Sequence, residues 1–165
     1  MMVHKKKKIR CRKNSQSRLN PVSFSVDTNK FFTVFLQNIR GLWNKNNELL
    51  GSVLPKLPHI VCLTEHQLKE QEIEKLSMNH YILGAKFCRQ NLKHGSTGIF
   101  VHEYLAFTNT VQEFCMWQDT ELCVVKINLL TAMIYVICVY RLPTVKFVCF
   151  IQGADIILNK LNTKY

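Results

Sequence analysis

The sequence predicts an α/β domain, and three segments of its first half indicate this class. Residues 31–38 form an aromatic and β-branched run, and residues 59–64 form a second apolar run, as buried strands do. Between them, leucine and valine recur near helical spacing across residues 44–57. A strand, a helix and a strand in this order form a βαβ unit, so both strands are expected in one sheet.

Both predicted strands deliver a polar side chain to their ends. The first run ends at Asn38, and the second is followed directly by Glu65. If the strands are parallel neighbours, Asn38 and Glu65 emerge at the same edge of the sheet, where α/β enzymes place their chemistry. The alternative for Glu65 is an exposed acid that starts a helix. His66 is expected to point to the other side of the extended chain.

Later segments continue the alternation of strand and helix. Pro55 lies late in the pattern of residues 44–57, so that helix is expected to bend or end there, before Pro58. The remaining predicted elements are a short acidic helix at 70–76, strands at 81–87 and 99–101, a hairpin of strands at 121–127 and 133–140, and a helix at 147–161.

The apolar stretch at residues 122–140 has a second interpretation, because its length matches a membrane span. Lys126 and Asn128 interrupt the stretch, and β-branched residues dominate it. A hairpin joined through residues 128–132 is therefore favoured, and we expect no membrane span.

Charge is distributed unevenly along the 165 residues, whose formal net charge is +11. Residues 1–30 are expected to be a basic, disordered tail, and residues 31–165 the folded part. The tail is a candidate for nuclear targeting or for contact with DNA, with RNA as an alternative. A solvated extension without a dedicated partner is the other interpretation. The cationic candidates are Lys5, Lys6, Lys7, Lys8 and Arg10.

Seven cysteines are scattered singly, without any Cys-x-x-Cys pair. An odd number without framework spacing argues against a zinc site or a secreted disulfide scaffold and favours a reducing compartment. No apolar run follows the N-terminal charges, so a signal peptide is not expected. We therefore expect an intracellular protein, with the nucleus favoured.

Four motifs occur in an order that resembles a known family. They are Gln-Asn-Ile-Arg-Gly-Leu at 37–42, Pro-His-Ile-Val-Cys-Leu-Thr-Glu at 58–65, Gly-Ser-Thr-Gly-Ile-Phe-Val at 95–101, and Val-Tyr-Arg-Leu-Pro at 139–143. With them, the chain resembles about the first half of an endonuclease/exonuclease/phosphatase (DNase I-like) domain. The version most similar to it lies at the N-terminus of animal non-LTR retrotransposon polyproteins.

The resemblance implies an incomplete four-layer α/β sandwich, in which two β-sheets are flanked by helices. It also implies Mg²⁺-dependent phosphodiester hydrolysis in DNA, without a small-molecule cofactor. By position in the motifs, Asn38 matches an amide that organises the scissile phosphate, and Glu65 matches the carboxylate that holds the metal. Tyr140 matches an aromatic that touches the phosphate, and Arg141 matches the loop beside it.

The sequence departs from this family where further catalytic groups are expected. It lacks the Gly-Asp-Xaa-Asn and Ser-Asp-His motifs, and its only Asp-Xaa-Asn, at 27–29, precedes the first predicted strand. A positioned general base contributes about 10²–10⁴-fold in rate, so we expect a weakly active or inactive fragment. A non-catalytic nucleic-acid-binding remnant and a phosphomonoesterase of the same superfamily are the alternatives. The oligomeric state is not predicted.

Overall fold

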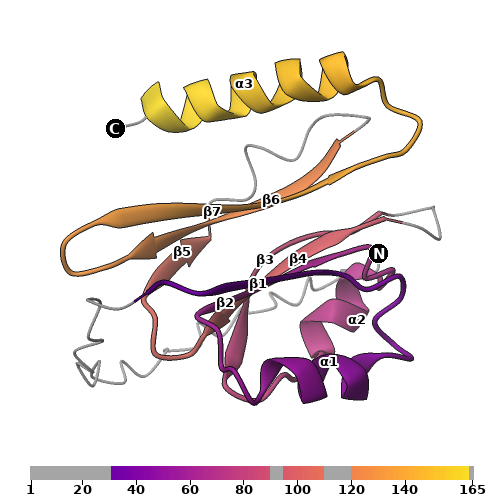
Figure 1. Cartoon of the computed structure of the whole chain (residues 1–165), viewed down its shortest axis with the longest axis vertical. Helices are drawn as coiled ribbons and strands as arrows, with labels where there is room; N and C mark the ends of the chain where they lie inside the picture. Colours follow the sequence, from indigo (N-terminus) through magenta and orange to yellow (C-terminus); the bar gives the residue numbers. More distant parts are fainter. Residues whose placement is uncertain (1–30, 90–94, 110–119, 164–165) are drawn as a thin grey trace, which may run out of the picture.

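Two β-sheets pack face to face, and helices cover their outer faces (Figure 1). The computed structural model describes residues 31–89, 95–109 and 120–163, so the predicted tail at 1–30 lies outside the described residues. From top to bottom, Figure 1 shows α3, the sheet of β5, β6 and β7, the sheet of β1 to β4, and then α1 and α2. The bounds are β1 Val34–Asn38, α1 Asn46–Val53, β2 Ile60–Thr64, α2 Glu70–Lys75, β3 Tyr81–Phe87, β4 Thr97–His102, β5 Phe107–Asn109, β6 Thr120–Asn128, β7 Met133–Arg141 and α3 Phe147–Thr163.

The first sheet has the strand order β1-β2-β4-β3. Strands β1 and β2 are parallel neighbours, and Asn38 pairs with Thr64 at their ends. The βαβ unit predicted from the sequence is therefore confirmed. Strand β4 runs antiparallel to both β2 and β3, which makes the sheet mixed.

The second sheet has the order β5-β6-β7, and its main feature is the predicted hairpin. In the register of β6 and β7, Glu121 lies opposite Tyr140, and Asn128 lies opposite Met133. The stretch at 122–140 thus forms two strands rather than one span. No helix in the described residues is long and apolar enough to cross a membrane.

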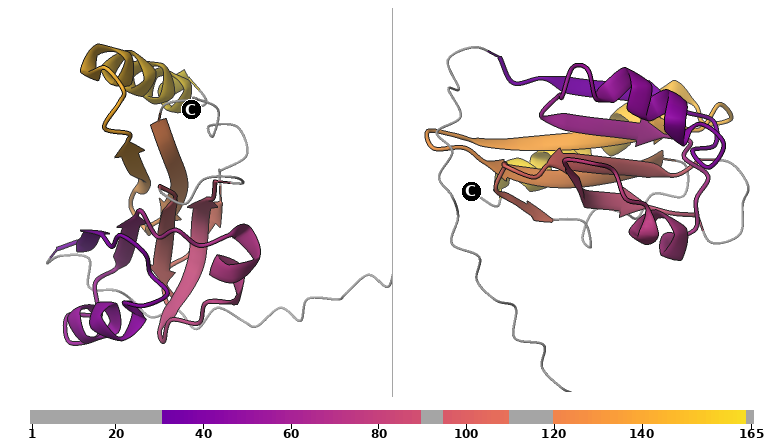
Figure 2. Two further views of the ribbon diagram at one scale, coloured as in Figure 1. Left: turned by 90° about the vertical axis from the view of Figure 1, so that its right-hand side faces the viewer. Right: turned by 90° about the horizontal axis from the view of Figure 1, so that it is seen from below.

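Alternate side chains of each strand enter different cores, as the pleat of a strand requires. On β2, Ile60 and Cys62 lie in the core between the two sheets, whereas Val61 and Leu63 pack with α1 and α2. A third, smaller core lies between the second sheet and α3, where Ile157 packs near Leu122 and Val124. The left view of Figure 2 shows α3 on one side of the sheets and α1 and α2 on the other.

The sequence predicted some boundaries less well than it predicted the elements. Helix α1 covers Asn46–Val53, so it ends ahead of Pro55 as expected, whereas its start was expected two residues earlier, at 44. The short strand β5 was not expected. It pairs with β6, so its strand state depends on tertiary pairing.

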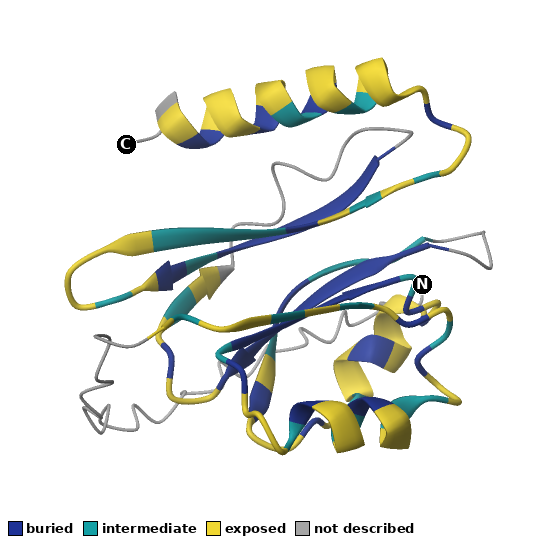
Figure 3. Ribbon diagram, viewed as in Figure 1, coloured by how far each residue is buried: buried dark blue, intermediate teal, exposed yellow. Residues whose placement is uncertain are grey.

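The outer part of the second sheet is less covered than its centre (Figure 3). Strand β6 is almost fully buried, whereas β7 is mostly intermediate or exposed and has one paired neighbour among the described residues. Phe147 and Val148 at the start of α3 are each 65% exposed. The described part of the chain therefore has an unpaired strand edge at β7 and exposed apolar surface at the start of α3.

The close approach of the two sheets gives a first prediction, at Gly84 in β3. A Cβ there would lie 2.7 Å from Val101 Cγ2 and 3.0 Å from Val125 Cγ1 of the facing sheet. Overpacking a core costs about 1–3 kcal/mol, so Gly84→Ala should lower the free energy of unfolding in urea by that amount. At Gly51 in α1 no atom lies within 4 Å of a Cβ. Gly51→Ala should therefore raise stability by about 0.5–1 kcal/mol, and equal effects at both positions would contradict the prediction.

Candidate active site

Asn38 and Glu65 meet at the ends of the two parallel strands. The Asn38 amide donates a hydrogen bond from Nδ2 to Glu65 Oε1 over 3.1 Å. Beside it, the N–H of Ile39 bonds to the carbonyl of Thr64 over 3.0 Å, which extends the strand pairing to the last residue. The pairing predicted from strand order and spacing therefore brings both polar side chains together.

The backbone holds the Glu65 segment in an uncommon conformation. Glu65 has a φ of 54° and Gln67 a φ of 58°, and non-glycine residues rarely adopt such left-handed values. The N–H of Gly41 donates to the Glu65 carbonyl over 2.8 Å, and the N–H of Leu42 donates to the His66 carbonyl over 3.0 Å. Strained residues persist only where surrounding contacts hold them, and these two hydrogen bonds supply such contacts. They fix the backbone of Glu65 and His66, from which the Glu65 carboxylate projects.

Tyr140 reaches the same carboxylate from the second sheet. Its hydroxyl donates a hydrogen bond to Glu65, and that bond, followed by burial, raises the pKa of Tyr140 to about 12. The phenol is therefore neutral at physiological pH and acts as a donor. Asn38, Glu65 and Tyr140, which lie far apart in the sequence, come together where the edges of the two sheets meet.

A second carboxylate, which sequence reasoning missed, lies beside this group. Glu121 is 2% exposed and forms an ion pair with Arg89. Its other oxygen accepts the backbone N–H of Ser96, in a turn where Gly95 and Ser96 have φ values of 100° and 82°. Glu121 thereby links β6 of the second sheet to the segments that flank β3 and β4 of the first.

Glu121 has a raised pKa, chiefly because burial disfavours its charged form. The Ser96 N–H and the Arg89 guanidinium act in the opposite direction, and the Glu65 carboxylate raises the pKa further. The influence of Glu65 shows that the two acids are electrostatic neighbours. The sequence held one signal of this, because a hairpin centred on residues 128–132 places Glu121 opposite Tyr140.

The side chain of Arg141, also predicted for the site, does not join this cluster. Arg141 follows Tyr140 in β7, so its side chain projects from the opposite face of the sheet, and its Nη1 donates to the Val145 carbonyl over 2.6 Å. The phosphate contact of Arg141 stays a prediction. The five cationic tail candidates, Lys5, Lys6, Lys7, Lys8 and Arg10, lie outside the described residues.

His66 points away from the carboxylates, as expected. Its ring is fully buried on the helix side of the first sheet, where a Cβ on Gly98 would lie 3.7 Å from it. Burial lowers the pKa of His66 to about 4, and its Nδ1 accepts the N–H of Leu68 over 3.1 Å. His66 is therefore a neutral core residue.

Three cysteines occupy the core between the sheets rather than a metal site. Cys62, Cys123 and Cys138 are buried free thiols, and the thiol of Cys138 donates to the Leu63 carbonyl over 3.6 Å. Hydrogen bonding to Cys138 and burial both raise the pKa of Cys62. In the parts of the chain that are described, no group of three or more His, Cys, Asp or Glu side chains is placed to hold a metal ion.

Comparison with solved structures decides the fold. The endonuclease domain of TRAS1, a telomere-specific non-LTR retrotransposon, superposes with a TM-score of 0.60 at 15% sequence identity. The alignment covers 78% of this chain and 54% of that one. The chain has a DNase I-like fold. No protein-family model and no curated protein matches the sequence.

The polar cluster draws on both sheets of the DNase I-like fold. The chain spans about half the length of the matched structure, 54% of it. Both sheets of the sandwich are nevertheless present here, and each contributes a polar side chain to the cluster at Glu65. The fold class predicted from the sequence is confirmed, while the chemical roles of Asn38, Glu65 and Tyr140 stay predictions.

Proposed function

We propose that this chain hydrolyses phosphodiester bonds in DNA with Mg²⁺, as a slow endonuclease of the non-LTR retrotransposon type acting in the nucleus. One observation supports this function above the others. The Glu65 carboxylate is held between the Asn38 amide and the Tyr140 hydroxyl, at the junction of two sheets in a DNase I-like fold.

The donor set at Glu65 is compatible with Mg²⁺. This ion prefers oxygen ligands, and proteins often bind it with one or two carboxylates while water and substrate phosphates complete the coordination. Glu65 would hold the ion, whereas Glu121 is engaged by Arg89 and Ser96. Bound there, Mg²⁺ would neutralise negative charge on the phosphate and on the leaving oxygen.

The side chains around Glu65 have distinct roles in this proposal. Asn38 orients the carboxylate through its amide and can turn the same amide toward a phosphate oxygen. Tyr140, whose pKa is raised to about 12, keeps its proton, and its hydroxyl would donate to a phosphate oxygen in place of Glu65 when substrate is bound. Both are neutral donors, so they bind an anionic substrate without competing for the ion.

The test is a plasmid-nicking assay with Mg²⁺, in which Glu65→Gln should slow nicking by about 100-fold or more. The amide keeps the shape of Glu65 and removes its charge. Glu48→Gln, at an exposed acid in α1, is the matched control and should nick like the unaltered chain. Equal nicking by the Glu65→Gln variant would contradict the role of Glu65, and absence of nicking in every form would contradict the proposed activity.

A second candidate is DNA binding without cleavage, which is favoured by the formal net charge of +11. Affinity would then come mainly from phosphate contacts with cationic residues, and it would fall steeply with salt. DNA binding should be measured at two salt concentrations, with and without residues 1–18. DNA binding without cleavage would be supported if the affinity is salt-sensitive, if it is lost when residues 1–18 are removed, and if no Mg²⁺-dependent nicking is seen.

A further inference from the structure

In the described part of the chain, strand β7 (Met133–Arg141) is the longest edge of either sheet. It pairs with β6 on one side, and the register of that pair runs over nine residues without a shift. Its side chains are mostly half-buried or exposed (Figure 3). The open side of β7 is therefore a regular row of backbone donors and acceptors with which another strand can pair.

The other three edges are shorter or protected. Strand β5 has three residues and β1 has five. Strand β3 has seven residues, but its register shifts between Leu83 and Ala85, and it carries Lys86. Short edges, bulges and lysines keep sheets from pairing edge to edge. Strand β7 contains no Pro, Gly, Lys or acid, and its one charge, Arg141, lies at its end, where it donates to the Val145 carbonyl.

The sequence of β7 is complementary to itself in the antiparallel direction. If two copies are aligned about Ile137, all nine residues of each strand are paired, and paired side chains share a face of the sheet. Tyr135 of one copy then lies opposite Val139 of the other, and such pairs of aromatic and β-branched residues stabilise sheets. Arg141 lies opposite Met133, so the alignment places no like charges opposite each other.

The area of such an interface lies within the range of specific complexes. Nine residues of an extended strand span about 30 Å, and the layers packed on both faces of the second sheet give its edge a depth of about 20 Å. The interface would then bury about 600 Å² on each copy, or about 1,200 Å² in total, which is the lower end of the range for specific interfaces. We therefore expect a reversible complex.

We propose that this chain forms a symmetric dimer, in which β7 of one copy pairs antiparallel with β7 of a second copy. Pairing across a two-fold axis uses the unprotected edge of each copy, so among the described residues no further edge of this kind remains and the assembly closes. Three strands from each copy then form one continuous sheet of six strands. The inference goes beyond the proposed nuclease activity and does not depend on it.

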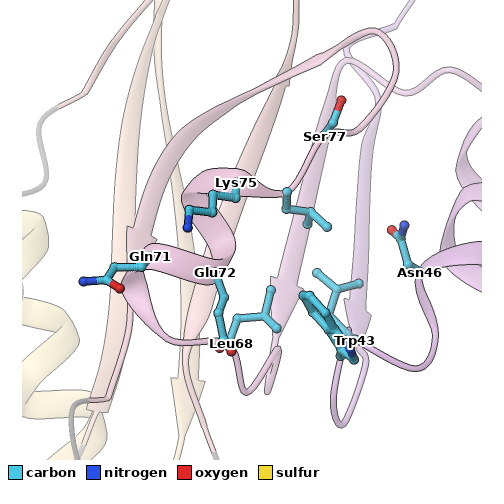
Figure 4. Close-up of a pocket in the computed structure, with 9 residues that line it drawn as sticks. Trp43, Asn46, Leu68, Gln71, Glu72, Lys75 and Ser77 are labelled. Carbon is cyan, nitrogen blue, oxygen red and sulfur yellow. The ribbon is translucent and has the colours of Figure 1, made fainter.

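The dimer leaves the candidate active site and the helical side of the first sheet accessible. Tyr140 keeps its hydrogen bond to Glu65, because edge pairing uses backbone groups. A groove of about 520 Å³, lined by Trp43 and Leu68, lies between the segment after β1 and α2 (Figure 4). Helices α1 and α2 lie on the opposite side of the sheets from α3 (Figure 2), so a partner at β7 does not cover this groove.

Sedimentation velocity of the full chain tests the dimer, at a salt concentration of about 0.3 M that screens repulsion between the basic N-terminal segments. We expect a shift to twice the mass of the chain as its concentration rises. Val139→Lys should weaken dimerisation by about tenfold or more, because the lysine occurs twice in each dimer. Val34→Lys, at a 49% exposed valine on the β1 edge, is the matched control and should leave the dimer unchanged.

Cysteine cross-linking tests the register and does not depend on the stability of Val139→Lys. Ile137 lies on the proposed two-fold axis, so Ile137→Cys should give a covalent dimer when glutathione disulfide oxidises the two facing thiols. Val139→Cys is the control, because in this register its two copies are too far apart for a disulfide. Mass spectrometry of the linked peptides identifies the bond.

Three results would overturn the proposal. The first is a chain that stays monomeric at every concentration. The second is a dimer that a folded Val139→Lys variant does not weaken, which would place the interface elsewhere. The third is equal cross-linking of the Ile137→Cys and Val139→Cys variants. None of these readouts uses nicking, so failure of the Glu65→Gln test bears on the proposed activity and not on the dimer.

Discussion

Replacement of Arg89 by methionine should lower the free energy of unfolding by about 3–5 kcal/mol at pH 7, because it leaves a buried carboxylate without its cation. The side chains of Arg89 and Glu121 are only 15% and 3% exposed, so solvent cannot take over the role of the guanidinium. Ser96 would still donate its backbone N–H to Glu121. One neutral donor does not compensate a buried charge.

The loss should depend on pH in a defined direction. Arg89 opposes the effect of burial on Glu121, so its removal raises the pKa of Glu121 further. A carboxyl group whose pKa is higher in the folded state destabilises that state once pH rises above the unfolded pKa. The deficit of Arg89→Met should therefore be largest at neutral pH and should shrink as the pH is lowered and Glu121 takes up a proton.

Urea unfolding in EDTA at pH 7 measures the loss of stability, and the same experiment at pH 5 measures how far that loss shrinks with pH. Lys56→Met, at an exposed lysine in the turn after α1, is the control and should change stability by less than about 0.5 kcal/mol. The double variant Arg89→Met/Glu121→Gln should recover much of the loss, because no buried charge remains. A deficit below about 1 kcal/mol at pH 7, or one that is constant with pH, would contradict the prediction.

The second large effect is acid destabilisation through His66. The pKa of His66 is about 4 in the folded chain, compared with its ordinary value of 6.5. Between these values the unfolded chain binds a proton that the folded chain does not, so stability is present above pH 6.5 and is lost as the pH falls toward 4. The difference in pKa corresponds to about 3 kcal/mol.

Comparison of His66→Asn with the unaltered chain isolates this contribution. Asparagine can place an acceptor near the position of Nδ1, where the Leu68 N–H donates, but it does not titrate. His66→Asn will be less stable at pH 7 because the ring is lost, yet its stability should fall by about 3 kcal/mol less between pH 7 and pH 4.

Replacement of an exposed histidine gives the control for this slope. The side chain of His80 is 53% exposed and contacts Glu103 at the surface, so His80→Asn removes a histidine without disturbing the core. The free energy of unfolding is measured by chemical unfolding at half-unit steps of pH for the unaltered chain, for His66→Asn and for His80→Asn. If His66→Asn and the unaltered chain lose stability in parallel, burial of a neutral His66 is not the source of the acid sensitivity.

The strand and helix patterns were sufficient to predict the parallel pair of strands in the first sheet and half of the site. The βαβ order placed Asn38 and Glu65 at one edge, because parallel strands joined by one helix end on the same side. The hairpin of β6 and β7 was predicted for a similar reason, since its two strands are close in the sequence. These features depend on local periodicity and on short connections.

The Arg89–Glu121 pair was not predicted, although both residues are near the site. Arg89 follows β3 in the first sheet, and Glu121 lies near the start of β6 in the second sheet. The pair therefore forms only when the two sheets pack together. Composition gave no indication that Glu121 is buried, because acids are mostly exposed unless they are paired.

The sequence by itself determined most of the strands and helices, and it placed Asn38 and Glu65 together, because side-chain periodicity and chain connectivity act locally. Only the tertiary structure decided which side chains from the second sheet reach Glu65. Tyr140 hydrogen-bonds to Glu65 because the hairpin turns that face of β7 toward the first sheet, whereas Arg141, one residue later, faces the opposite way. Packing of two sheets sets such contacts, and they depend on burial across the whole core rather than on any local pattern.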